Sequence, residues 1–174
     1  MVEGCIEHIH KWLACNRLRL NPDKTEVIWC SSVRRADTFD HPTLSIGQSV
    51  IQPASVVRDL GFQLRADLSI TDQVSAVVRS CFYNIRQLRI IRSSLTPSAL
   101  RDSAYALVLS RLDYCNTLYA NAPATELHRL QMLINTAARV VSGRSRFDHI
   151  TDYIRDELHW LPVVKRVQFK IGTM

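Results

Sequence analysis

The sequence has 174 residues, 47% of them hydrophobic, and a formal net charge of +6, which suits one ordinary domain or two small subdomains and argues against disorder. Its five cysteines are widely spaced, without a C-x-x-C pair or a matching histidine pattern, so neither a disulfide framework nor a zinc site is expected. No stretch approaches the roughly 18 apolar residues of a membrane span or resembles a signal peptide, so we expect an intracellular protein, cytoplasmic or nuclear, with no membrane partner.

The chain begins with a predicted helix. Apolar residues recur at helical spacing over residues 4–18, and the run breaks at Asn21-Pro22. Residues 25–30 are rich in β-branched and aromatic side chains, which predicts a strand, and the polar residues 33–42 predict a loop.

Short strands are predicted next. Residues 44–51 alternate apolar and polar side chains around a central Gly-Gln, and residues 56–64 alternate again. These patterns predict three short antiparallel strands.

Helical spacing then dominates the chain. We expect helices over residues 71–95, 97–119, 124–142, 150–158 and 163–171, with Pro97 opening the second and Gly143 ending the third. The middle of the second is apolar on nearly all sides, so we expect it to be the buried helix. The aromatic residues expected in the core are Tyr105, Tyr114, Tyr119 and Trp160.

These elements predict an α+β fold of two parts. Residues 1–70 would form an N-terminal helix and a small antiparallel sheet, and residues 71–174 would form an α-helical array. Positive charge is concentrated in residues 71–147, which contain ten arginines and four acidic residues.

Arginine is the residue whose planar fork best matches phosphate. One group falls opposite the apolar face of the first long helix, formed by Val74, Val78, Cys81 and Ile85, and a second surrounds Gly143. A face of this kind predicts contact with a nucleic-acid backbone, while a solvated helix surface, a calmodulin-target helix or a membrane-surface helix has the same pattern. The two groups are Arg79, Arg86, Arg89 and Arg92, and Arg139, Arg144 and Arg146.

Five segments, in this order along the chain, resemble parts of LINE-type (non-LTR) retrotransposon reverse transcriptases. Residues 12–26 (WLACNRLRLNPDKTE) are similar to the segment after the catalytic hairpin, and residues 57–69 (VRDLGFQLRADLS) resemble the primer-grip hairpin. Three later runs resemble successive segments of the thumb: residues 110–120, 130–144 and 149–171. The resemblance therefore covers nearly the whole chain.

The resemblance implies a fragment of an RNA-directed DNA polymerase. Residues 1–70 would be the C-terminal part of the palm with a primer-grip-like hairpin, and residues 71–174 a thumb-like region truncated at its C-terminus. Its partners in the intact enzyme would be an RNA template and an RNA–DNA hybrid. The chain would hold the hybrid by shape and phosphate, without reading sequence.

Catalytic aspartates are absent from the expected motif. The sequence contains no Asp-Asp pair, and in the family that hairpin precedes the helix corresponding to residues 4–18. The chain alone is therefore predicted to be inactive, with no catalytic residue and no cofactor of its own. Mg²⁺ is expected for the intact enzyme.

Three further residues are singled out by the resemblance. Lys24 matches a lysine that would lie near the phosphates of the incoming nucleotide in the intact enzyme, although a solvated turn lysine explains Asn-Pro-Asp-Lys equally simply. Arg58 and Gly61 match the grip hairpin, where glycine lets the backbone approach the primer closely. An ordinary strand with a bulge glycine is the alternative.

Three interpretations without enzymatic activity stay open. The first is an inert fragment of a degenerate element, and the second is a retained binding module that grips RNA or an RNA–DNA hybrid. The third is a helical protein-interaction domain, because an apolar surface that faced the rest of the palm would need a partner to cover it. The residues expected on that surface are Leu18, Val27, Trp29 and Val57.

Overall fold

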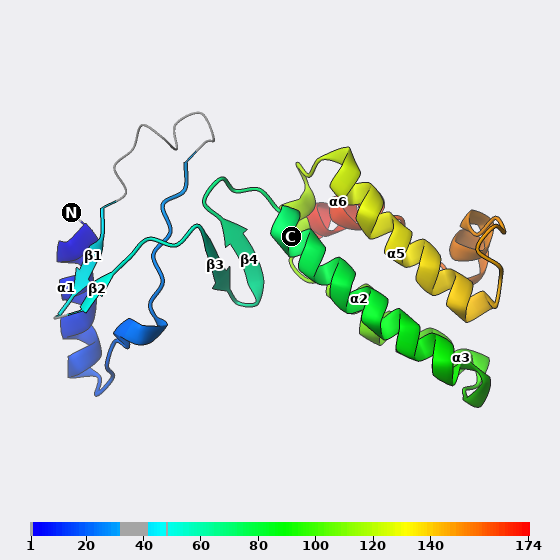
Figure 1. Ribbon diagram of the computed structural model, residues 1–174, viewed down its shortest axis with the longest axis horizontal. Coiled ribbons are helices and arrows are strands. Elements are labelled where there is room, and N and C mark those ends of the chain that lie inside the picture. The colour runs from blue at the N-terminus through cyan, green and yellow to red at the C-terminus, as the bar shows by residue number, and fades with distance from the viewer. Residues whose placement is uncertain (1, 32–41, 48) are drawn as a thin grey trace. The chain divides into compact units, whose positions relative to one another are not determined.

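The computed structural model describes residues 2–31, 42–47 and 49–174, so the loop predicted over residues 33–42 lies almost wholly outside the described residues. The chain divides into two compact units, Met1–Ser69 and Ile70–Met174. The first combines helix with antiparallel strands and the second is helical (Figure 1). The α+β fold class is confirmed. Each unit is described by itself.

The first unit contains two β-hairpins. β1 pairs with β2 and β3 pairs with β4, each pair antiparallel and each a separate two-stranded sheet. The prediction of three strands was therefore wrong, because the run over residues 56–64 turns back on itself at Leu60-Gly61. The elements are α1 (Val2–Cys15), the 3₁₀ helix η1 (Pro22–Lys24), β1 (Leu44–Ile46), β2 (Ser49–Ile51), β3 (Val56–Asp59) and β4 (Phe62–Arg65).

The strand predicted over residues 25–30 is also wrong. Val27 makes only an isolated parallel bridge with Pro53, and its carbonyl accepts from the amide of Ala54 at 2.7 Å. Proline has no amide hydrogen with which to extend the ladder. The β-rich composition of this segment therefore yields one bridge instead of a strand.

The second unit is built on the long helices α2 and α5. They lie side by side and run in the same direction (Figure 1). Val74, Cys81 and Ile85 of α2 and Leu133 and Ile134 of α5 are almost completely buried. The helices are α2 (Thr71–Ile91), η3 (Arg92–Ser94), α3 (Pro97–Ala104), η4 (Tyr105–Leu109), α4 (Ser110–Asp113), η5 (Asn116–Tyr119), α5 (Ala124–Ser142), η6 (Tyr153–Glu157) and α6 (Val163–Thr173), of which η4 and η6 are π-helical and η3 and η5 are 3₁₀.

Several predicted helix ends are confirmed. The Thr96 hydroxyl accepts from the amide of Ala99 at 3.3 Å, and Pro97 occupies the first helical position of α3. At the end of α5, Gly143 takes a left-handed φ of 73° and closes the helix. These are the positions at which a side-chain cap, proline and glycine each satisfy a helix end at low cost.

The helix predicted over residues 97–119 departs from expectation. It changes to π-helical spacing at Tyr105 and ends before Tyr114, whose ψ is 120°, and Cys115 is left-handed with φ 52°. Only its inner face is covered: Val108 and Leu109 are fully buried, while Leu107 is exposed. The prediction that this helix is the buried one was therefore wrong. One of its faces packs against other helices, and the other is exposed to solvent despite its apolar side chains.

Two of the four expected core aromatics are in the core. Tyr119 and Trp160 are 1% and 5% exposed. Tyr105 and Tyr114 are 49% and 46% exposed, so their assignment to the core was wrong. Both lie on the outward face or at the frayed end of the interrupted helix.

Candidate nucleic-acid interface

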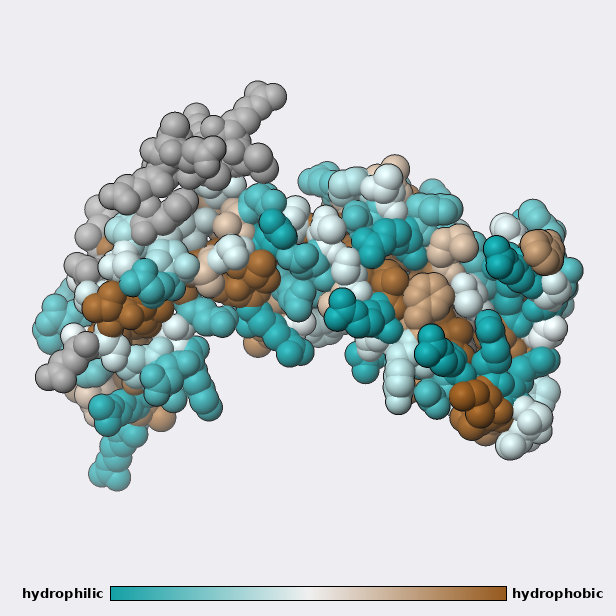
Figure 2. Space-filling view, viewed as in Figure 1, coloured by the Kyte–Doolittle hydropathy of each residue, from teal (hydrophilic) through white to brown (hydrophobic). Residues whose placement is uncertain are grey.

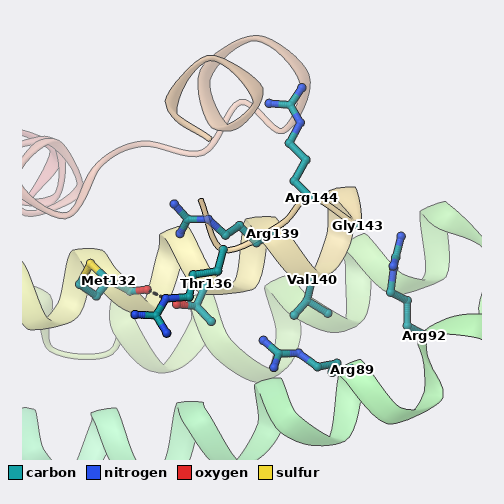
Figure 3. Close-up of a pocket in the computed structure, with 9 residues that line it drawn as sticks. Arg89, Arg92, Met132, Thr136, Arg139, Val140, Gly143 and Arg144 are labelled. Atoms are coloured by element: carbon teal, nitrogen blue, oxygen red, sulfur yellow. Dashed lines mark hydrogen bonds between the residues drawn. The ribbon is translucent and has the colours of Figure 1, made fainter. Parts of the chain in front are cut away.

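An arginine-lined cavity of about 610 Å³ lies where α2 and α5 end. Because the two helices run in the same direction, their C-terminal turns come together (Figure 1). The cavity takes cations from both helices and from the loop after α5 (Figure 3). We call it the arginine groove; it is lined by Arg89, Arg92, Met132, Thr136, Arg139, Val140, Gly143, Arg144 and Arg146.

The sequence predicted two separate arginine groups, and the fold joins part of each. Arg89 and Arg92 come from the first group and Arg139 and Arg144 from the second. Arg146, also of the second group, lines the groove as well. Arg79 and Arg86 belong to α2 but lie outside the groove.

Two of the groove arginines are positioned by contacts with the loop after α5. Arg144 donates from its guanidinium to the His149 carbonyl at 2.9 Å and stacks on the Tyr153 ring, 5.0 Å from its centroid. Arg139 donates to the Asp148 carbonyl at 3.4 Å. These acceptors are uncharged, so neither guanidinium charge is neutralised by them.

Arg139 also has a donor to spare. Its Nε is buried without a hydrogen-bond partner among the described residues. Buried donors in native proteins are nearly always satisfied. This N–H is therefore an exception among the buried donors of the described residues.

Arg89 and Arg92 form the opposite wall. Both are exposed, and within residues 70–174 neither side chain makes a hydrogen bond or an ion pair. Arg89 lies in the last turn of α2 and Arg139 in the last turn of α5, where the negative end of the helix dipole favours cations. The lining residues, all within the described part of the chain, include five arginines and no carboxylate.

Small side chains leave room between these arginines. The floor includes Thr136 and Val140 of α5, and the rim includes Gly143 (Figure 3). A Cβ at position 143 would collide with the guanidinium of Arg92. The left-handed backbone therefore favours glycine here, and a side chain at this position would require the exposed guanidinium of Arg92 to move.

The apolar face of α2 differs slightly from expectation. Val74, Cys81 and Ile85 are buried as predicted, whereas Val77 replaces Val78 in the core. The same helix also exposes the rings of Phe82 and Tyr83, which are 41% and 61% exposed. Its outer surface is therefore mixed in character and less basic than its arginines suggest.

The predicted grip hairpin is formed by β3 and β4. Arg58 is exposed on β3, and its amide donates to a Glu26 carboxylate oxygen at 3.4 Å. Gly61 lies in the two-residue turn, with φ of 89°, and the register Asp59↔Phe62 leaves no bulge. Gly61 is therefore a turn glycine, and the alternative interpretation as a bulge glycine was wrong.

Lys24 is an exposed residue at the end of η1. The Asn21 side chain accepts from the amide of Asp23 at 3.0 Å, and the Lys24 amide donates to the Asn21 carbonyl at 3.2 Å. The turn is thus held by Asn21, and no described residue forms an ion pair with the Lys24 ammonium. Its proposed role toward nucleotide phosphates stays a prediction.

Four residues were expected on an apolar surface that needs a partner. Of these, Leu18 is 56% exposed. Val27, Trp29 and Val57 are half-buried within the first unit. The indole N–H of Trp29 donates to the Pro42 carbonyl at 3.1 Å. Of these four side chains, only Leu18 therefore offers a large bare apolar surface.

The described residues do not fit the Mg²⁺ that the resemblance implies for the intact enzyme. They include no group of three or more His, Cys, Asp or Glu side chains able to hold a metal ion. We assign no metal-dependent step to them. Separately, none of the helices described has the length and apolar character needed to cross a bilayer.

Comparison of the chain with protein-family models, with curated protein sequences and with solved structures gives no match.

Proposed function

We propose that this chain is the palm end and thumb of a LINE-type reverse transcriptase and contributes template–primer binding, without catalytic aspartates of its own. The ordered resemblance of five segments supports the family. The observation that carries the binding proposal is the convergence of five arginines, from two helix ends and one loop, in a groove without an acidic residue among its described lining.

The groove suits a phosphate backbone better than a base edge. Guanidinium groups donate in a planar fork that matches two phosphate oxygens. Arg139 and Arg144 are held by carbonyls of the loop, while the side chains of Arg89 and Arg92 are unpaired among the residues described. Such a site neutralises phosphates, releases counterions and fixes the position of a duplex without reading its sequence.

Binding to an RNA–DNA hybrid across a salt titration tests this proposal. The variant carries Arg89→Ala, Arg92→Ala and Arg146→Ala, three exposed positions at which truncation removes little packing. We expect the slope of log K against log salt to shrink by roughly 2 to 3, since each phosphate that is no longer neutralised changes it by about 0.9 in duplex DNA. Circular dichroism checks that the variant is folded.

A second triple variant provides the matched control. Arg79→Ala, Arg86→Ala and Arg111→Ala remove the same charge from positions outside the groove. A smaller change in slope than in the groove variant is expected. An equal or larger change would mean that the outer surface, and not the groove, is the interface, and would overturn the proposal.

Protein interaction is the second candidate function, supported by one observation. Phe82, Tyr83 and Ile90 of α2 are 41%, 61% and 68% exposed, and apolar patches remain among hydrophilic side chains on the face of α2 and α5 in Figure 2. Patches of this kind commonly mark association sites. A Tyr83→Ser, Ile90→Ser variant that abolishes self-association in light scattering, while hybrid binding persists, would favour this role beside the first.

A further inference from the structure

A second cavity, of about 330 Å³, lies in the helical unit and shares no lining residue with the arginine groove. Its volume falls within the roughly 300–1,000 Å³ typical of small-molecule sites. Segments far apart in sequence meet there: Tyr105 opens η4, Asn116 opens η5, Trp160 precedes α6, and Phe169 and Lys170 belong to α6.

Asn116 lines this cavity, and its side chain has an unsatisfied acceptor. The residue is only 4% exposed, and its Nδ2 faces a carboxylate oxygen of Asp113 at 3.5 Å. Arg166 donates to both oxygens of Asp113, at 2.7 and 2.9 Å, so both of these oxygens act as acceptors. The amide nitrogen must therefore face Asp113, which fixes the orientation of the amide.

The remaining atom, Asn116 Oδ1, is buried and has no hydrogen-bond partner among the described residues. Buried acceptors of this kind are rare in native structures, because no hydrogen bond offsets the free-energy cost of removing the oxygen from water. A ligand N–H donating to Oδ1 would satisfy it.

Aromatic rings and one cation complete the lining. Tyr105 and Phe169 are 49% and 63% exposed, whereas Trp160 is 5% exposed. Arg166 is already paired with Asp113, while Lys170 forms no ion pair within residues 70–174. Flat rings, an acceptor and a free ammonium together suit a planar aromatic ligand that has N–H donors and carries negative charge.

The backbone is unusual at three places on the cavity wall. Tyr105 begins a π-helical turn. Cys115, next to Asn116, and His159, next to Trp160, have φ of 52° and 53°, and in residues 70–174, all of them described, these are the non-glycine residues with positive φ. Both π-turns and left-handed non-glycine residues gather at functional sites.

We propose that this cavity binds one unpaired nucleobase together with its phosphate. The base stacks on the aromatic side chains, a base N–H donates to Asn116 Oδ1, and the phosphate lies at Lys170. The arginine groove holds backbone without reading bases, so this site adds a separate contact for a free nucleotide or for an unpaired base of an RNA strand.

Isothermal titration of the full chain tests the proposal with three kinds of ligand: the four nucleoside 5′-monophosphates, a five-nucleotide single-stranded RNA and a blunt RNA–DNA hybrid. Phe169→Ala and Lys170→Ala, both at exposed positions, are expected to weaken nucleotide binding by about fivefold or more, the loss typical of one stacking ring. Phe82→Ala and Lys165→Ala, exposed residues outside the cavity, should leave it unchanged.

The ligands also distinguish a free nucleotide from an unpaired base of an RNA strand. Binding of monophosphates but not of the single strand identifies a free-nucleotide site, and single-strand binding that Phe169→Ala weakens identifies an unpaired base. Absence of both, or unchanged affinity in Phe169→Ala, overturns the proposal. The groove variant Arg89→Ala, Arg92→Ala, Arg146→Ala should retain nucleotide binding, so failure of one site is distinguishable from failure of the other.

Asn116→Leu gives a second, independent readout. Removing the orphan acceptor should weaken nucleotide binding. The melting temperature should stay close to unchanged, because loss of a buried unsatisfied oxygen offsets loss of the long 3.5 Å hydrogen bond to Asp113. A lower melting temperature with intact nucleotide binding would mean that the amide only supports the fold, contrary to the proposal.

Discussion

The guanidinium of Arg92 occupies the space that a side chain at Gly143 would need. Arg92 follows α2 and Gly143 closes α5, so this one contact joins the two helix ends that form the arginine groove. The close approach of Arg92 therefore uses the absence of a side chain at a position whose sequence signal indicates only a helix stop.

Gly143→Ala should lower the free energy of unfolding by more than the left-handed backbone alone explains. A φ of 73° costs an alanine about 1–2 kcal/mol, and displacement of Arg92 adds to this. In an Arg92→Ala background the cost should fall to the backbone contribution, which a double-mutant cycle in urea measures. Equal costs in both backgrounds would refute the contact.

Cys81 should make the helical unit sensitive to alkaline pH. Its side chain is fully buried, and this burial raises the pKa of the thiol from 9.0 to about 11. The unfolded state ionises first, so this stabilising difference is complete below about pH 9 and is lost as pH rises toward about 11. The free energy of unfolding, measured in urea, should fall more across this pH window for wild type than for Cys81→Ala.

Thiol labelling gives a check on the same residue. Cys5, Cys15 and Cys30 are exposed, whereas Cys81 is buried. Iodoacetamide at pH 8 should modify the exposed thiols in native protein and reach Cys81 only after unfolding, as mass spectrometry of peptides would report. Rapid native labelling of Cys81 would contradict the packing of α2.

Arg166→Met should destabilise the helical unit by about 2 kcal/mol. The Arg166 side chain is 10% exposed and pairs with Asp113, which is 33% exposed. Breaking a fully buried pair typically costs roughly 3–5 kcal/mol, and partial solvation of Asp113 reduces this penalty. Lys165→Met is the neighbouring control, and Asp113→Ala should recover part of the loss in the double variant.

Leu60→Asn should stabilise the β3–β4 hairpin and weaken binding to hybrid. Leu60 is 85% exposed with φ of 46°, and Gly61 has φ of 89°, a two-residue turn that favours Asn-Gly. We expect about 1 kcal/mol of added stability, measured by amide exchange in β3 and β4. Unchanged affinity for the hybrid would argue against a role of this turn in gripping the primer.

Sequence alone was sufficient where local physics decides the structure. The helices over residues 71–91 and 124–142 follow from apolar spacing, and their neighbours Thr96, Pro97 and Gly143 act through caps and backbone preference within a few residues. The sequence also identified the candidate arginines, because their positions along the chain do not depend on folding. It did not show that arginines from both groups line one groove, because that depends on how the helices pack.

Tertiary structure decided what depends on partners distant in sequence. Residues 25–30 form no strand because the neighbouring segment offers Pro53, and Tyr105 is exposed because only one face of its helix finds a covering surface. The parallel course of α2 and α5 brings Arg92 to Gly143 and leaves Arg79 and Arg86 outside the groove. Helical periodicity fixes the face on which a side chain lies, but packing alone determines what that face meets.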